Sequence, residues 1–202
     1  MLLGSGPIGS APIGAPTEGV TKIAQSSKII VLAHGALLIP EANVPEGMLV
    51  KTADLWLHLA RELGNDWTKA FNLSDREWEE MLAGAFKRDK FDEVILTPRS
   101  GDHRRDVIAF RKPMVGSIRI LASMKAYSPR NTVPHSHVDE MLGVLTRESG
   151  GTKVLIATTA DFAPDLFAAP GLKELVPGRV ELMNGAKLQQ WLKELTQNTG
   201  SE

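Results

Sequence analysis

Residues 117–127 form a candidate strand that carries reactive side chains along one side. Alternation places Ile118, Ile120, Ala122, Met124 and Ala126 on one face, and Arg119, Leu121, Ser123, Lys125 and Tyr127 on the other. An ammonium, a hydroxyl and a guanidinium on the same side of a strand are suited to binding a phosphate group. The alternative for the same pattern is the polar, solvent-facing side of an antiparallel sheet.

A carboxylate stands at the start of the preceding candidate strand. The polar turn over residues 100–105 leads into Asp106, and apolar residues follow it. An aspartate there, a lysine on the neighbouring strand and an acidic residue on the preceding helix would hold a hard divalent cation and a phosphate together. The residue types therefore predict metal-assisted chemistry on a phosphate, in which a cation offsets the charge that grows on the phosphoryl oxygens.

Positive charge is concentrated in the same part of the chain. The 202 residues have a net charge of −1, yet residues 1–98 carry −4, residues 99–130 carry +6 and residues 131–202 carry −3. The overall balance argues against a general polyanion binder. The local excess is typical of a surface that faces phosphates, although a solvated basic patch gives the same pattern.

Periodicity predicts the helices and strands that must position these residues. A helix is expected over 53–63 with Gly64 as the residue after its end, and the capping box of Ser74 and Glu77 begins a second helix that runs to about Lys87. Strands are expected over 91–96, 106–111 and 117–127, and their short connections favour an antiparallel meander. Downstream we expect a helix over 135–147, strands over 153–158 and 180–183, and a last helix from Asn184 to about 195. This order predicts a mixed α/β sheet flanked by helices.

The region before residue 73 is expected to have two parts. Residues 1–27 contain the related pentads GSGPI and GSAPI and predict a flexible, Pro/Gly-rich arm, whose spaced isoleucines are suited to docking on a protein partner. Residues 28–72 predict a small strand and helix region, with short strands at 28–33, 36–39 and 48–50. No apolar run approaches the roughly 20 residues of a membrane helix, and cysteine is absent. We therefore expect no membrane partner and a cytoplasmic location.

Several segments resemble the Mrr-type restriction endonucleases of the PD-(D/E)xK nuclease superfamily. They are WEEMLAGAF (78–86), FDEVILTPRSGDHRRDV (91–107), ILASMKAY (120–127), TTADFA (158–163) and VELMNGAKLQQWL (180–192). The resemblance implies a restriction-endonuclease-like αβββαβ core over residues 73–197. It further implies a Mg²⁺-dependent DNA endonuclease of restriction or defence type, able to use Mn²⁺, that acts on DNA as a homo-oligomer.

The resemblance also implies roles for individual residues. Asp106 would bind the metal together with Glu79 and the Met124 backbone carbonyl, and Lys125 would be the catalytic lysine, with Ser123 as a further catalytic residue. Ser100, Gly101 and Asp102 would support the turn. We expect DNA contacts from Arg99, Arg104, Arg105, Arg119, Arg130 and His137. His135 and His137 diverge by about 200° on a helix, which favours separate roles over a metal pair.

Two departures from the family pattern support an alternative function. Ser123 stands where the family usually has an acidic residue or glutamine, and a neutral hydroxyl is a weak ligand for Mg²⁺. Arg104 stands where the family turn commonly has glycine, so a positive φ there would strain the backbone. The alternative is a catalytically degenerate module of the same fold that binds DNA or protein, in a phage or prophage setting.

Overall fold

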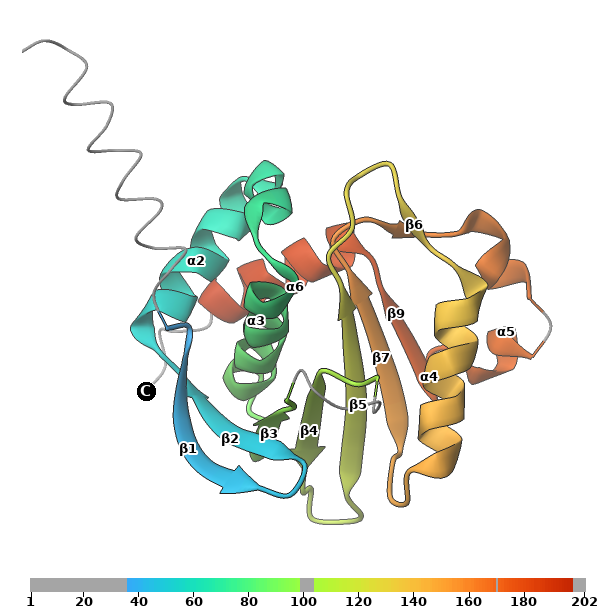
Figure 1. Cartoon of the computed structure of the whole chain (residues 1–202), viewed down its shortest axis with the longest axis horizontal. Coiled ribbons are helices and arrows are strands. Elements are labelled where there is room, and N and C mark those ends of the chain that lie inside the picture. Colours follow the sequence, from blue (N-terminus) through green and yellow to red (C-terminus); the bar gives the residue numbers. More distant parts are fainter. Residues whose placement is uncertain (1–35, 99–103, 170, 198–202) are drawn as a thin grey trace, which may run out of the picture. The chain divides into compact units, whose positions relative to one another are not determined.

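The computed structural model describes residues 36–98, 104–169 and 171–197, all of which lie in the second of two units, 35–202, into which the chain divides. A seven-stranded mixed sheet runs through the described residues, with neighbouring strands in the order β1-β2-β3-β4-β5-β7-β9 (Figure 1). Its strands are β1 (Leu38–Val44), β2 (Gly47–Thr52), β3 (Glu93–Leu96), β4 (Val107–Arg111), β5 (Ile118–Lys125), β7 (Lys153–Thr158) and β9 (Val180–Met183). The expectation of a mixed α/β fold is confirmed.

The pairing of neighbouring strands changes once across this sheet, from antiparallel to parallel. Strands β1 to β5 pair antiparallel, whereas β5, β7 and β9 pair parallel. The antiparallel meander over β3, β4 and β5 is the one that the short connections predict. A parallel pair needs a crossover connection, and the helix α4 (His135–Arg147) provides it between β5 and β7. A second, two-stranded parallel pair joins β6 (Thr132–Val133) to β8 (Asp161–Phe162).

Helices cover both faces of the large sheet (Figure 1). One face packs on α2 (Asp54–Asn65), α3 (Asp75–Arg88) and α6 (Gly185–Gln197), and the other packs on α4 and α5 (Leu172–Leu175). Two 3₁₀ helices, η1 (Trp67–Asn72) and η2 (Pro164–Ala168), complete the described elements. None of the described helices combines the length and the apolar character that crossing a membrane requires.

The covering helices decide between the two interpretations of strand β5. Ala122 and Met124 belong to the apolar cluster on the α3 side, whereas Leu121 belongs to the cluster on the α4 side. Ser123 shares its face with Leu121 and is 1% exposed. The solvent-facing interpretation of this side is therefore wrong, because α4 buries it.

The hairpin of β1 and β2 is longer than expected. Strand β1 continues through residues 40–44, between the strands expected at 36–39 and 48–50, and the turn occupies only residues 45 and 46. Pro40 is compatible with a strand because β1 is an edge strand, where a missing N–H leaves no partner unsatisfied. The expected strand at 28–33 and the arm at 1–27 lie outside the described residues.

Residues 38–72 join the rest of the described chain through shared hydrogen bonds and apolar contacts. Strand β2 extends the sheet by pairing with β3, and α2 packs against α6. The helix α2 continues through Gly64 to Asn65, so the prediction that Gly64 follows the helix end is wrong. A side chain at Gly64 would lie 2.9 Å from Cγ of Lys193, and its absence lets α2 approach α6 closely.

Helix α3 begins as its capping box predicts. The Ser74 hydroxyl accepts a hydrogen bond from the Glu77 amide at 3.3 Å, and the Glu77 carboxylate accepts one from the Ser74 amide at 2.8 Å. Farther along, Gly84 faces the buried indole of Trp56, whose Nε1 donates to the Met81 carbonyl at 3.0 Å. A Cβ atom at position 84 would lie 2.1 Å from that Nε1. This glycine therefore sets how closely α2 and α3 can pack.

Replacing Gly84 with alanine should destabilise the fold even though alanine favours helices. The methyl group overlaps a fully buried indole, and overpacking of this kind costs about 1–3 kcal/mol. We expect a fall in the melting temperature of several degrees, measured by calorimetry or circular dichroism. Gly178→Ala, at an exposed glycine whose added methyl would meet only a carbonyl at 3.7 Å, is the control. Equal melting temperatures for the two variants would contradict this account of α2 and α3.

Candidate active site

Asp106 lies immediately before β4 and is fixed by the neighbouring strand β5. Its backbone amide donates to the Ala122 carbonyl at 2.8 Å, and its Oδ2 accepts from the Met124 amide at 2.6 Å. These two hydrogen bonds bracket Ser123, so that Asp106 and Ser123 lie opposite each other. The main-chain hydrogen bond from Met124 fixes the direction of the carboxylate.

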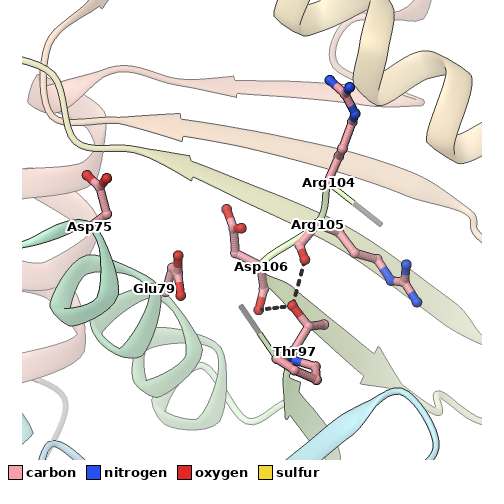
Figure 2. A pocket seen from close by; sticks show the side chains of 7 residues that line it. Asp75, Glu79, Thr97, Arg104, Arg105 and Asp106 are labelled. Atoms are coloured by element: carbon pink, nitrogen blue, oxygen red, sulfur yellow. Dashed lines mark hydrogen bonds between the residues drawn. The ribbon is translucent and has the colours of Figure 1, made fainter. Parts of the chain in front are cut away.

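The end of β3 supports Asp106 from its other side. The Thr97 hydroxyl donates to the Arg105 carbonyl at 2.6 Å and lies 3.1 Å from the Asp106 carbonyl (Figure 2). From α3, Nη1 of Arg76 donates both to Glu79 at 2.8 Å and to the Thr97 carbonyl at 3.2 Å. One guanidinium therefore joins the helix carboxylate to the strand that supports Asp106.

A pocket of about 260 Å³ lies between α3 and the start of β4. It is lined by Asp75, Glu79, Thr97, Pro98, Arg104, Arg105 and Asp106. Figure 2 shows Asp75 and Glu79 of α3 on one side of this space and Asp106 on the other, whereas Arg104 extends away toward the helix α4. The carboxylates that the sequence analysis chose as metal ligands, Glu79 and Asp106, thus share one polar pocket.

Burial raises the pKa of Asp106 above its usual value, and the negative charge of Glu79 raises it further. The Met124 amide, the positive charge of Lys125 and the Ser123 hydroxyl act in the opposite direction. Two carboxylates in a partly desolvated pocket resist being ionised together. A cation between the two carboxylates would offset their mutual repulsion.

Lys125 is the last residue of β5 and is partly exposed. Its side chain lies on the same face of β5 as that of Ser123, and its positive charge acts on both Asp106 and His137. Among the described residues no ion pair neutralises this ammonium. The structure thus brings together the four residues that the sequence analysis named for catalysis: Asp106, Glu79, Ser123 and Lys125.

The chemistry of these donors suits Mg²⁺. No cluster of three histidine, aspartate or glutamate side chains arranged to hold a metal occurs in the described ranges. Mg²⁺ is usually held by one or two carboxylates and completes its octahedron with water and substrate oxygens. The carboxylates of Asp106 and Glu79, with the carbonyl of Met124, fit that pattern. We therefore find the donor set compatible with the expected metal.

His137 does not lie at the surface. It is 7% exposed, and its Nε2 lies 3.2 Å from the Ser123 hydroxyl while its Nδ1 lies 3.2 Å from a Glu140 carboxylate oxygen. Burial lowers the pKa of His137 to about 4, and the charges of Lys125 and Arg104 lower it as well. His135, two residues earlier, pairs with Asp165 instead, so the two histidines separate as expected.

The arginines chosen for DNA contacts occupy different environments. Arg105 is 7% exposed, and its guanidinium pairs with Glu148, which also pairs with Arg119 at 3.2 Å. Arg104 is exposed and pairs with Glu140. Its φ is +52°, the positive value that a glycine in this turn would adopt without strain.

Arg130 is exposed beyond the end of β5. Four residues assigned to the turn and its DNA contacts lie outside the described residues: Arg99, Ser100, Gly101 and Asp102.

The sequence analysis missed three residues of the site. Arg76 and Thr97 carry no motif, because their role depends on how α3 meets β3. Glu140 follows His137 by three positions on a helix, a spacing at which side chains meet. That spacing is a signal for the pair, and only the fold shows that the pair faces Ser123.

Similar proteins occur among solved structures and family models. Among curated proteins none matches the chain. The solved structures similar to it include the MspJI restriction endonuclease in complex with a 27-mer oligonucleotide, at 16% identity and a TM-score of 0.46 over 75% of this chain and 34% of that one. They also include the DNA modification-dependent restriction endonuclease AspBHI, at 16% identity and a TM-score of 0.46 over 79% of this chain and 39% of that one. The chain thus spans between a third and two fifths of these two enzymes.

A family model also matches the chain. The model of the Mrr catalytic domain, described as a restriction endonuclease, matches residues 71–192, more than half of the sequence. Every described residue assigned above to catalysis or metal binding falls within this match. The chain therefore belongs to the restriction endonuclease family.

Proposed function

We propose that this chain is a Mg²⁺-dependent endodeoxyribonuclease of restriction type, which hydrolyses phosphodiester bonds in DNA. The observation that carries the proposal is the convergence of Asp106 and Glu79 on one pocket. The ammonium of Lys125, which has no ion-pair partner within the described part of the chain, is close enough to act on the Asp106 carboxylate. Carboxylates and a lysine in this relation match the needs of metal-assisted attack on a phosphate.

Each residue has a defined task in this proposal. Asp106 and Glu79 would hold Mg²⁺, or Mn²⁺ in its place, through their carboxylates, and Met124 would hold it through its carbonyl. The bound cation would act as a Lewis acid and would lower the pKa of a water molecule. Lys125 orients the attacking water in line with the scissile bond and offsets negative charge on the phosphoryl oxygens.

Exposed arginines provide the DNA contacts in this proposal. Arg104 lines the pocket, and Arg130 is exposed five residues after Lys125, the last residue of β5. We leave out Arg105 and Arg119, because their side chains are largely buried where they pair with Glu148, and His137, because it is buried. Cutting both strands needs two sites, so we expect a homo-oligomer that acts on cytoplasmic DNA in a defence role.

A second candidate function is a DNA-binding module without nuclease activity. The observation that favours it is Ser123, a neutral residue whose hydroxyl is already engaged by His137. In this case the pocket would bind no cation, and Asp106 would be a buried charge close to the DNA.

Lys125→Ala should remove cleavage while leaving the fold intact. Because the lysine supplies positive charge at the reacting phosphate, we expect a loss of roughly 10²–10³-fold in rate. The assay is nicking of supercoiled plasmid, methylated and unmethylated, with Mg²⁺, Mn²⁺ or EDTA. Lys173→Ala, which removes an exposed lysine from α5, is the matched control and should cut at the wild-type rate.

Cleavage that persists in Lys125→Ala or in EDTA would refute the proposed mechanism. If the wild-type protein does not cut, fluorescence anisotropy with Asp106→Ala tests the second candidate. A binding module should bind DNA equally well or more tightly after this substitution, because a negative charge near the DNA is removed.

Asp106→Asn should stabilise the metal-free protein at neutral pH. Because the folded state raises the pKa of Asp106, its ionised form opposes folding, and stability is lost as the pH rises through that pKa. Asparagine keeps an acceptor oxygen for the Met124 amide and carries no charge. We expect a gain on the order of 1 kcal/mol, or a few degrees in melting temperature, that shrinks toward pH 4.

Mg²⁺ provides the second half of this test. It should raise the melting temperature of the wild-type protein and leave that of Asp106→Asn unchanged. Asp139→Asn, at an exposed position on α4, should stay within about 0.5 kcal/mol of the wild type under all conditions. A less stable Asp106→Asn variant at pH 7.5 would show that the ionised carboxylate does not oppose folding.

A further inference from the structure

Ser123 lies at the end of a hydrogen-bonded series of side chains that leads into helix α4. Its hydroxyl lies 3.2 Å from Nε2 of His137, and Nδ1 of the same ring lies 3.2 Å from Oε2 of Glu140. Ser123 is 1% exposed and His137 is 7% exposed. The hydroxyl is too deeply buried to act as a nucleophile on a macromolecule, so this series must act on the site in another way.

The chemistry of the three groups sets the direction of their hydrogen bonds. A carboxylate only accepts hydrogen bonds, so the ring nitrogen that faces Glu140 carries the proton. In a neutral imidazole the other nitrogen, Nε2, is then an acceptor. In this tautomer the Ser123 hydroxyl donates its proton to His137, because a hydroxyl that donated to Asp106 instead would leave Nε2 without a donor.

This direction has a consequence on the side of Asp106. The single hydroxyl proton has two acceptors within reach, the His137 ring and the Asp106 carboxylate. When the proton points to His137, the lone pairs of the Ser123 oxygen face the Asp106 side. Lone pairs of two oxygens side by side are unfavourable unless a cation lies between them. The same arrangement is favourable for a cation that prefers oxygen ligands.

We infer that His137 and Glu140 form a relay that holds the Ser123 oxygen as a ligand for the divalent cation, in place of the acidic or amide side chain that the family usually has there. This inference rests on the proposed function, because it assigns further residues to the same metal site. His137 and Glu140 are positioning residues, since they act only through Ser123. Hydrogen bonds to a ligand commonly change metal affinity by 10–100-fold when removed.

The volume around Ser123 supports the same inference. The His137 ring contacts the serine hydroxyl directly, so a glutamate or glutamine at position 123 would collide with it. The ring therefore fills the space that a longer ligand would need. Serine and histidine form one unit here, and replacing either alone disturbs the other.

The tautomer of His137 is the first test, and it needs neither metal nor activity. Long-range ¹H–¹⁵N spectra of the full-length protein at pH 7.5 should show a protonated Nδ1 and an unprotonated Nε2 for this ring. In Glu140→Gln the amide can donate to Nδ1, so the proton should move to Nε2 without loss of the fold. A wild-type ring protonated at Nε2 alone would overturn the inference.

Binding of Mn²⁺ by calorimetry, without DNA, is the second test. We expect Ser123→Ala, His137→Ala and Glu140→Gln each to weaken binding by at least tenfold. The double variant Ser123→Ala/His137→Ala should be no weaker than either single variant, because the residues act as a unit. His135→Ala, on the same helix but paired with Asp165, should bind Mn²⁺ like the wild type.

The possible failures of the two proposals differ. Wild-type protein that does not bind Mn²⁺ would overturn the proposed function and this inference with it. Wild-type binding that stays unchanged in Glu140→Gln and in a folded His137→Ala variant would overturn the inference alone.

Ser123→Glu/His137→Ala provides a rescue, because the longer carboxylate then has room. It should bind Mn²⁺ more tightly than His137→Ala, whereas Ser123→Glu alone should lower the melting temperature.

Discussion

The hydrogen bond from the Met124 amide to the Asp106 carboxylate is the constraint on which the site depends. It joins the residue immediately before β4 to the residue next to Lys125 on β5, so it fixes the two charged groups relative to each other. Because the donor is a main-chain amide within a paired strand, its position follows from the register of β4 and β5. The relative position of Asp106 and Lys125 therefore depends on the register of β4 and β5. A shift of one residue in that register would separate the carboxylate from the lysine.

Burial on both faces of the sheet explains why the polar residues of β5 are arranged as they are. A central strand covered by α3 and α4 leaves no solvent for a mid-strand hydroxyl, so Ser123 needs a partner from a helix. His137 supplies it, and Glu140 in turn satisfies the other side of the ring. Lys125 needs no such partner, because it is the last residue of the strand and its side chain is partly exposed to solvent. The site thus forms where a buried strand emerges.

Local signals predicted much of the fold, and tertiary contacts account for what they missed. The capping box at Ser74 and the apolar face over 135–147 identify their helices from neighbouring residues alone, and both helices lie where they were expected. Gly64 was misjudged because its role is the approach of α6, more than a hundred residues away in sequence. The site shows the same division. Asp106 and Lys125 follow from strand starts and alternation, whereas the burial of Arg105 and His137 depends on where α4 packs.

Glu140 links two features of the site that the sequence presents as separate departures from the family. Arg104 holds a left-handed backbone conformation that costs a non-glycine residue about 1–2 kcal/mol. Its side chain pairs with the same carboxylate that faces His137, so the strained turn before Asp106 and the buried serine opposite it share one partner. Glycine at 104 with a carboxylate at 123 is one self-consistent solution. Arginine at 104 with serine, histidine and glutamate is a second, because Glu140 pairs with Arg104 and also faces His137, the partner of the Ser123 hydroxyl.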